Sequence, residues 1–135
     1  MRVFLDANVL FSASSSGSAM AHMIADATEK AIVMTSDVAC AEARKNLFLK
    51  RSTWVPSFEE LLNDIEVVHT SVFKLPVALA DKDVPVLCAA IRAECDLFVT
   101  GDRTDFGHLF GTKVLGVEII TPLGLGQRLK ALDDE

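Results

Sequence analysis

Four acidic residues lie beside the apolar segments of this sequence. Asp6 ends the apolar run RVFLD, and Asp102 follows the apolar run LFVT by two residues. Glu42 lies about two turns into one predicted helix, and Asp83 lies at the start of another. Clustered carboxylates raise one another's pKa, and a hard divalent cation such as Mg²⁺ or Mn²⁺ removes that conflict. The four residues therefore predict metal-assisted hydrolysis of a phosphodiester bond.

Strand and helix signals alternate along the chain, which predicts an α/β fold with a parallel sheet. In such a sheet, ligands bind beyond the carboxyl ends of the strands, so Asp6, Glu42 and Asp102 are expected to converge there. Asp83 joins them only if its helix begins near the same edge. The expected strands are 2–6, 31–35, 66–70, 97–100 and 117–122. The expected helices are 19–30, 37–51, 57–65, 80–95 and 122–132, with Ser36 and Thr121 as N-caps and Pro85 in a first turn.

Length and composition restrict the class of protein. The 135 residues, half of them hydrophobic, are expected to form a single domain over 1–135 with a substantial core. No apolar run is long enough to span a bilayer, and the N-terminal segment predicts a first strand instead of a signal peptide. The triplet DFG at 105–107 lacks the other motifs of a protein kinase. The net charge of −6 argues weakly against non-specific binding of polyanions.

The three cysteines indicate a reducing compartment. Cys40, Cys88 and Cys95 are an odd number without CxxC spacing, which argues against a disulfide framework and a zinc site. Cys88 and Cys95 are expected on one face of the helix over 80–95. We therefore expect buried thiols in a cytoplasmic protein.

Four segments together resemble the PIN domain, the PilT N-terminus-like family. They are FLDANVL (4–10), SDVACAEARKNL (36–47), DKDVPVLCAA (81–90) and LFVTGDRTDFG (97–107). The resemblance covers nearly the whole chain and is nearest to the prokaryotic single-domain members, which include VapC-like toxins. It implies a three-layer α/β/α fold with a mainly parallel sheet of about five strands. It also implies a Mg²⁺- or Mn²⁺-dependent endoribonuclease whose products carry 5′-phosphate and 3′-hydroxyl ends.

The resemblance assigns roles to the acidic residues. It makes Asp6, Glu42, Asp83 and Asp102 the catalytic, metal-binding quartet. The small apolar neighbours of Glu42 predict that its setting is at least partly buried. Asp105 corresponds to an additional metal-binding acid, although a carboxylate there would also cap a short helix formed by FGHLF.

Other residues are expected to support the site or to contact RNA. The resemblance implies that Asn8 and Thr100 orient carboxylates or water. Asp81 either supports the site or favours the helix N-terminus electrostatically. Arg44, Lys45 and Arg103 are the candidates for contacts with the phosphates of RNA. Arg44 and Lys45 have an alternative role, which is a favourable interaction with a helix dipole.

Several functions remain open at this point. The first is a ribonuclease toxin that cleaves RNA and is inhibited by a cognate antitoxin. Such a toxin is expected to form a homodimer and to have no membrane partner. The second is a PIN-like module that binds RNA or protein and cleaves poorly. The third is a receiver-like or phosphatase-like domain with Asp6 as phosphoacceptor, which the residues after VTGD do not support. The sequence leaves undetermined the RNA target, the existence of an antitoxin, and a choice between one and two metals.

Overall fold

The computed structural model describes residues 1–134 and places six strands in one sheet. The strand order is β3-β2-β1-β4-β6-β5, and every neighbouring pair is parallel except β5 and β6, which are antiparallel. The strands are β1 (Arg2–Leu5), β2 (Ile32–Ser36), β3 (Glu66–Val68), β4 (Leu97–Val99), β5 (Lys113–Val114) and β6 (Val117–Ile120). The predicted mainly parallel sheet is therefore confirmed, with one short antiparallel strand added at its edge.

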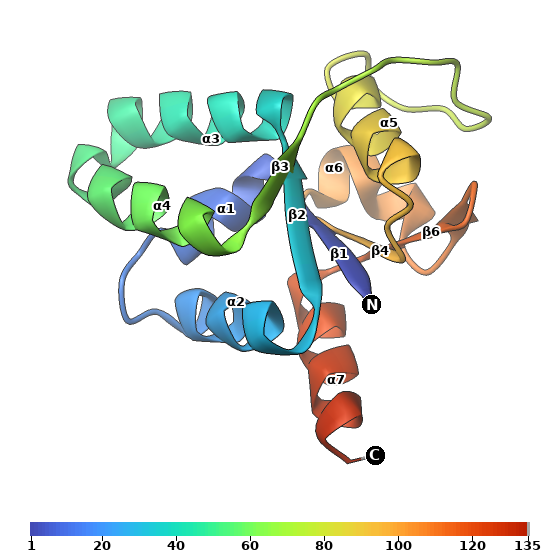
Figure 1. Ribbon diagram of the computed structural model, residues 1–135. Coiled ribbons are helices and arrows are strands. Elements are labelled where there is room, and N and C mark those ends of the chain that lie inside the picture. The colour runs from blue at the N-terminus through green and yellow to red at the C-terminus, as the bar shows by residue number, and fades with distance from the viewer. Residues whose placement is uncertain (135) are drawn as a thin grey trace.

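Helices cover both faces of this sheet. They are α1 (Ala7–Ala13), α2 (Ala19–Lys30), α3 (Asp37–Lys50), α4 (Val55–Leu61), α5 (Val84–Arg92), α6 (Arg103–Phe106) and α7 (Pro122–Asp133). Short 3₁₀ turns follow at Ser52–Trp54, Leu62–Asp64 and Gly107–Leu109. Figure 1 shows α1 to α4 on one side of the strands and α5 and α6 on the other, while α7 contacts α2. This is the PIN-like three-layer α/β/α fold that the sequence predicted.

The chain reverses its path across the sheet between β1 and β4. From β1 it moves outward to β2 and β3, and it then returns to place β4 on the other side of β1. The two strands pair in parallel, with Leu5 opposite Val99. Because the connections after β1 and β4 leave toward opposite faces, a crevice opens beyond their carboxyl ends. Ligand sites of open α/β sheets lie at such points.

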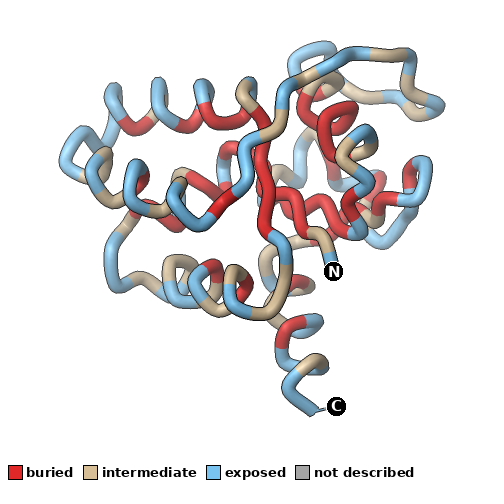
Figure 2. Tube along the Cα trace, viewed as in Figure 1, coloured by how far each residue is buried: buried red, intermediate tan, exposed pale blue. Residues whose placement is uncertain are grey.

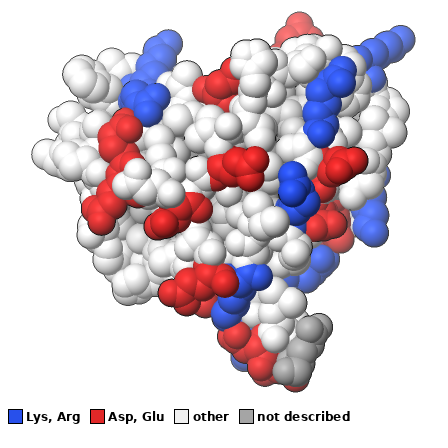
Figure 3. Space-filling view, in the orientation of Figure 1, with Lys and Arg blue, Asp and Glu red and all other residues white. Residues whose placement is uncertain are grey.

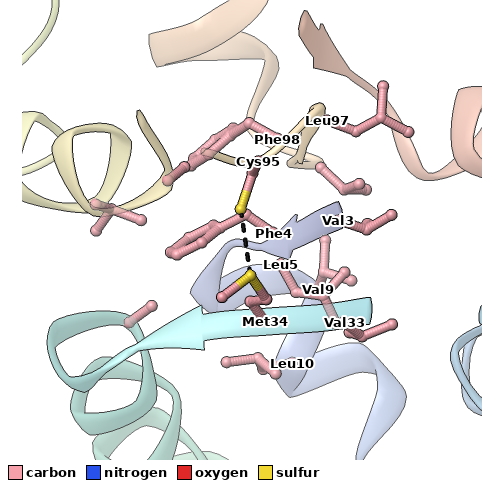
Figure 4. Close-up of a cluster of buried hydrophobic side chains, with 14 of the residues drawn as sticks. Val3, Phe4, Leu5, Val9, Leu10, Val33, Met34, Cys95, Leu97 and Phe98 are labelled. Atoms are coloured by element: carbon pink, nitrogen blue, oxygen red, sulfur yellow. Dashed lines mark hydrogen bonds between the residues drawn. The ribbon is translucent and has the colours of Figure 1, made fainter. Parts of the chain in front are cut away.

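Aromatic and aliphatic side chains from the central strands form the core, as the red segments of Figure 2 show. The Phe98 ring stacks on the Phe4 ring at 5.4 Å and lies 5.1 Å from the Phe106 ring. In Figure 4 the thiol of Cys95 points toward Met34, with 3.6 Å between the sulfur atoms. The three cysteines are free and buried, as predicted.

Helix caps explain where the helices begin. The side chain of Ser36 accepts a hydrogen bond from the backbone N–H of Ala39, and that of Thr121 accepts one from Gly124, each at 3.1 Å. Both caps satisfy an N–H group that has no partner within its helix. Pro85 lies in the first turn of α5, where its missing N–H costs nothing. These three sequence predictions are confirmed.

Other element boundaries differ from the sequence predictions. The helix predicted over 80–95 begins at Val84 and ends at Arg92, so Cys95 lies outside it and shares no helical face with Cys88. The helix predicted over 57–65 is α4, which starts two residues earlier, and its last residues form a 3₁₀ turn instead. Helix α1 and strand β5 were not predicted, because seven and two residues are too few to show a clear period. Among residues 1–134, no helix has both the length and the apolar character required to cross a membrane.

Candidate active site

A cleft of about 490 Å³ opens at the carboxyl ends of β1 and β4. All four members of the predicted quartet line it, so the structure brings them together, including Asp83, whose position the sequence left open. The cleft wall consists of Asp6, Ala7, Asn8, Val9, Phe11, Ser12, Met20, Glu42, Asn46, Lys50, Lys82, Asp83, Gly101, Asp102 and Pro122.

Three of these acids occupy the N-cap positions of helices that begin at this edge. Asp6 precedes α1, Asp83 precedes α5, and Asp102 precedes α6. Helix N-termini carry partial positive charge, which favours a carboxylate at this position. The order of strands and helices thus carries the three side chains to one place although they are far apart in the sequence.

The carboxylate of Asp6 is fixed by hydrogen bonds on both oxygens. Oδ1 accepts from the backbone N–H of Ala7 at 2.8 Å, and Oδ2 accepts from the hydroxyl of Thr100 at 2.8 Å and from Nδ2 of Asn8 at 3.1 Å. Burial raises the pKa of Asp6, the bonds from Thr100 and Ala7 oppose this rise, and the nearby charges of Glu42 and Asp102 add to it. The geometry of this side chain is therefore set before any ligand arrives.

Asn8 and Thr100 tie the ends of β1 and β4 together. The amide of Asn8 donates to Thr100 Oγ1 at 3.0 Å and accepts from the backbone N–H of Gly101 at 2.8 Å. Thr100 Oγ1 also accepts from the backbone N–H of Asp102 at 3.1 Å. Both residues thus make hydrogen bonds to Asp6 and to the backbone beside Asp102. The orienting role that the resemblance implies for them stays a prediction.

Asp83, Asp102 and Asp105 form the tightest acidic cluster. One carboxylate oxygen from each lies within 4.8 Å of the others, so the three side chains have the spacing of a cation site. Oδ1 of Asp102 accepts from the backbone N–H of Asp105 at 3.0 Å and caps α6. The 3₁₀ turn at Gly107–Leu109 has no side-chain cap, so the alternative role of Asp105 as the cap of FGHLF is wrong.

Asp83 is the buried member of this cluster. Asp83 is 8% exposed, and its Oδ2 has no hydrogen-bond partner in the described part of the chain. Although Asp83 occupies the N-cap position of α5, its side chain makes no capping hydrogen bond. Burial raises the pKa of Asp83 to about 6, and the proximity of Asp105 contributes in the same direction. A buried carboxylate oxygen without a partner is costly and is a natural ligand for a cation.

Lys82 lies against the same carboxylates. Its Nζ is 2.8 Å from Oδ2 of Asp105 and 3.6 Å from Oδ2 of Asp83. The hydrogen bond from Lys82 lowers the pKa of Asp105, and the same bond raises the pKa of Lys82. Lys82 was not among the predicted site residues, although its place between Asp81 and Asp83 was a signal for it.

Glu42 faces the cleft from α3 together with Asn46 and Lys50, at the four-residue spacing that aligns side chains on one helix face. The prediction that its setting is partly buried is wrong, because Glu42 is exposed. The small neighbours that suggested burial belong partly to the opposite face, where Ala39 and Ala43 pack into the core. The four-residue spacing from Glu42 would have identified Asn46.

The remaining predicted residues lie outside the cleft wall. Asp81 and Arg103 are exposed. Arg44 forms an ion pair with Glu59 at 2.8 Å and lies over the Phe58 ring. It borders a second hollow on α3 with Ala41, Lys45, Phe48 and Leu49. Their roles stay predictions.

The surface charge is mixed. The face in Figure 3 carries both acidic and basic side chains, with several acidic side chains gathered on its left side. The net charge of the chain is −6. The basic side chains in the cleft wall are those of Lys50 and Lys82.

The comparisons with known proteins support the fold. No family model matches the chain, and no curated protein matches it. Among solved structures, it is similar to a chain in the crystal structure of VapBC2 from Rickettsia felis bound to a DNA fragment from their promoter, with a TM-score of 0.65. The two are 12% identical, and the alignment covers 90% of this chain and 98% of that chain. At this identity the likeness shows that the two chains share a fold.

Proposed function

We propose that this protein is a metal-dependent endoribonuclease whose catalytic centre is formed by Asp6, Glu42, Asp83 and Asp102. The observation that carries the proposal is the buried Oδ2 of Asp83, which has no hydrogen-bond partner among residues 1–134 and belongs to a cluster with Asp102 and Asp105. The cluster lies at the reversal point of the sheet, where ligands of α/β proteins bind.

The side chains present fit a hard divalent cation. The cluster offers carboxylate oxygens, and among the residues that the structure describes no cysteine or histidine lines the cleft. This set of ligands favours Mg²⁺ or Mn²⁺ over softer metals. The pKa of Asp83 is about 6, so its carboxyl is mostly ionised and available near pH 7.5. When bound, such a cation would act as a Lewis acid toward a phosphate oxygen and increase the acidity of a nearby water.

The residues of the chain would divide the remaining work. Asp83, Asp102 and Asp105 would hold the cation, while Thr100 and Asn8 keep Asp6 in one orientation. Glu42 closes the site from α3, across the cleft. Preorganised groups of this kind reduce the reorganisation that the reaction requires.

We further propose that the nuclease is the toxin of a toxin–antitoxin pair and acts in the cytoplasm. The likeness to VapBC2 supports a partner protein, and the three free cysteines support a reducing compartment. Phe48 and Leu49, which are 73% and 71% exposed on α3, offer an apolar surface to a partner, either an antitoxin or a second copy.

Cleavage of labelled RNAs tests the nuclease proposal. Purified protein is incubated with structured and single-stranded RNAs in Mn²⁺, Mg²⁺ or EDTA, beside Asp6→Asn and Asp102→Asn. We expect metal-dependent cleavage that both variants lose and that Glu60→Gln, an exposed control on α4 from outside the cleft, retains. RNA binding without cleavage under every metal condition would favour a PIN-like binding module. Cleavage that is unchanged in both variants would exclude this site.

A further inference from the structure

Lys82 lies against two of the three carboxylates that form the acidic cluster. We propose that Lys82 is an internal competitor for the divalent cation: its ammonium group neutralises the cluster in the metal-free protein and must leave when the metal binds. This inference rests on the proposed function, because it concerns the same metal centre.

The distances support direct competition. Nζ of Lys82 lies 2.8 Å from Oδ2 of Asp105 and 3.6 Å from Oδ2 of Asp83, two of the three side chains that form the cluster. A Mg²⁺ ion bound to these carboxylates would lie about 2.1 Å from their oxygens. A protonated lysine has no lone pair to offer a metal, so it cannot become a ligand. Two cations so close together would repel each other strongly.

Lys82 compensates the cluster only in part. A single ammonium contacts two of the three carboxylates, and its distance to Asp83 is too long for a hydrogen bond. Within the described part of the chain, Oδ2 of Asp83 therefore remains without a hydrogen-bond partner, although the ammonium of Lys82 lies nearby. A divalent ion would approach that oxygen more closely than the ammonium does. It would also neutralise a larger share of the negative charge of the cluster. The lysine therefore weakens metal binding without abolishing it.

The lysine is also free to leave. Its side chain is 65% exposed, and it lies in the turn that precedes α5, outside the hydrophobic core. An exposed side chain gives up few packing contacts when it changes rotamer. Because Lys82 lines the cleft, the displaced ammonium would stay close enough to meet a substrate phosphate.

Lys50 provides the matched control. It lies on the wall of the same cleft, at the end of α3, and no ion pair joins it to a carboxylate of residues 1–134. Replacing Lys50 changes the net charge of the protein by the same amount as replacing Lys82. A general electrostatic effect would therefore appear in both variants, whereas direct competition would appear in one.

The test measures binding of Mn²⁺ by calorimetry to metal-free wild type, Lys82→Gln, Lys82→Arg, Lys50→Gln and Asp102→Asn. We expect Lys82→Gln to bind Mn²⁺ roughly fivefold more tightly than wild type, the upper range for an exposed ion pair. Lys82→Arg keeps the charge and should stay near the wild-type affinity, as should Lys50→Gln. The rise in melting temperature on adding Mn²⁺ should be larger for Lys82→Gln than for wild type.

The outcomes separate this proposal from the proposed function. If wild type binds Mn²⁺, Asp102→Asn does not, and Lys82→Gln binds no more tightly than wild type, the competitor role is overturned and the metal centre stands. Equal tightening in Lys82→Gln and Lys50→Gln would also overturn it. If wild type and all variants fail to bind Mn²⁺, both proposals fail.

Discussion

The raised pKa of Asp83 leads to a prediction about stability. In the absence of metal, the folded protein must ionise a carboxyl group that is buried and close to Asp105. Asp83→Asn removes this ionisation and keeps nearly the same shape. We therefore expect the variant to be more stable than wild type near neutral pH when EDTA is present, even though the substitution removes a residue of the proposed catalytic centre.

The magnitude follows from the pKa. Burial raises the pKa of Asp83 from 3.8 to about 6, and each unit corresponds to about 1.4 kcal/mol. Because the folded state binds this proton more tightly than the unfolded state, the contribution to stability is complete below pH 3.8 and is lost as the pH rises to about 6. The free energy of unfolding of Asp83→Asn minus that of wild type should thus increase by about 2 to 3 kcal/mol between pH 4 and pH 7.5.

Urea unfolding at several pH values in EDTA measures this difference. Groups that titrate alike in both proteins cancel in the comparison. Asp81→Asn is the matched control, because Asp81 is exposed two residues earlier, and it should show no such pH dependence. A difference between Asp83→Asn and wild type that stays constant from pH 4 to pH 7.5 would refute the reasoning. So would a difference that decreases as the pH rises.

Two further predictions concern residues that hold or complete the site. Thr100→Val removes the hydroxyl that donates to Asp6, so we expect a loss of about 1–3 kcal/mol in urea unfolding and at least a roughly tenfold slower cleavage of RNA. Thr35→Val removes a buried hydroxyl that donates to the Leu5 carbonyl, and Thr35 does not line the cleft. This variant should lose comparable stability and keep the cleavage rate; equal rates for both variants would contradict the orienting role of Thr100. Glu42→Gln alters an exposed side chain, so its melting temperature should hardly change while RNA cleavage falls roughly tenfold. Glu60→Gln, an exposed control on α4, should leave both unchanged, and wild-type cleavage by Glu42→Gln would remove Glu42 from the proposed centre.

The strands and caps of this fold could be predicted from sequence because their signals are local. Apolar runs marked β1, β2 and β4, and Ser36 and Thr121 marked the starts of α3 and α7. A cap depends on one side chain and on N–H groups two or three residues away, so it survives in any tertiary context. Elements that depend on distant partners were missed. Strand β5 exists because it pairs with β6, and its two residues carry no period of their own.

The sequence by itself determined which acids follow strands or begin helices, and the α/β alternation that directs Asp6 and Asp102 to one edge of the sheet. Only the tertiary structure decided that Asp83 joins them, because this depends on α5 lying on the face opposite α1 and beginning at the cleft that Asp6 and Asp102 line. It also decided that Lys82 contacts Asp105 and that Glu42 is exposed. Burial and ion pairing depend on segments distant in sequence, so the environment of a charged residue is fixed only when the chain has folded around it.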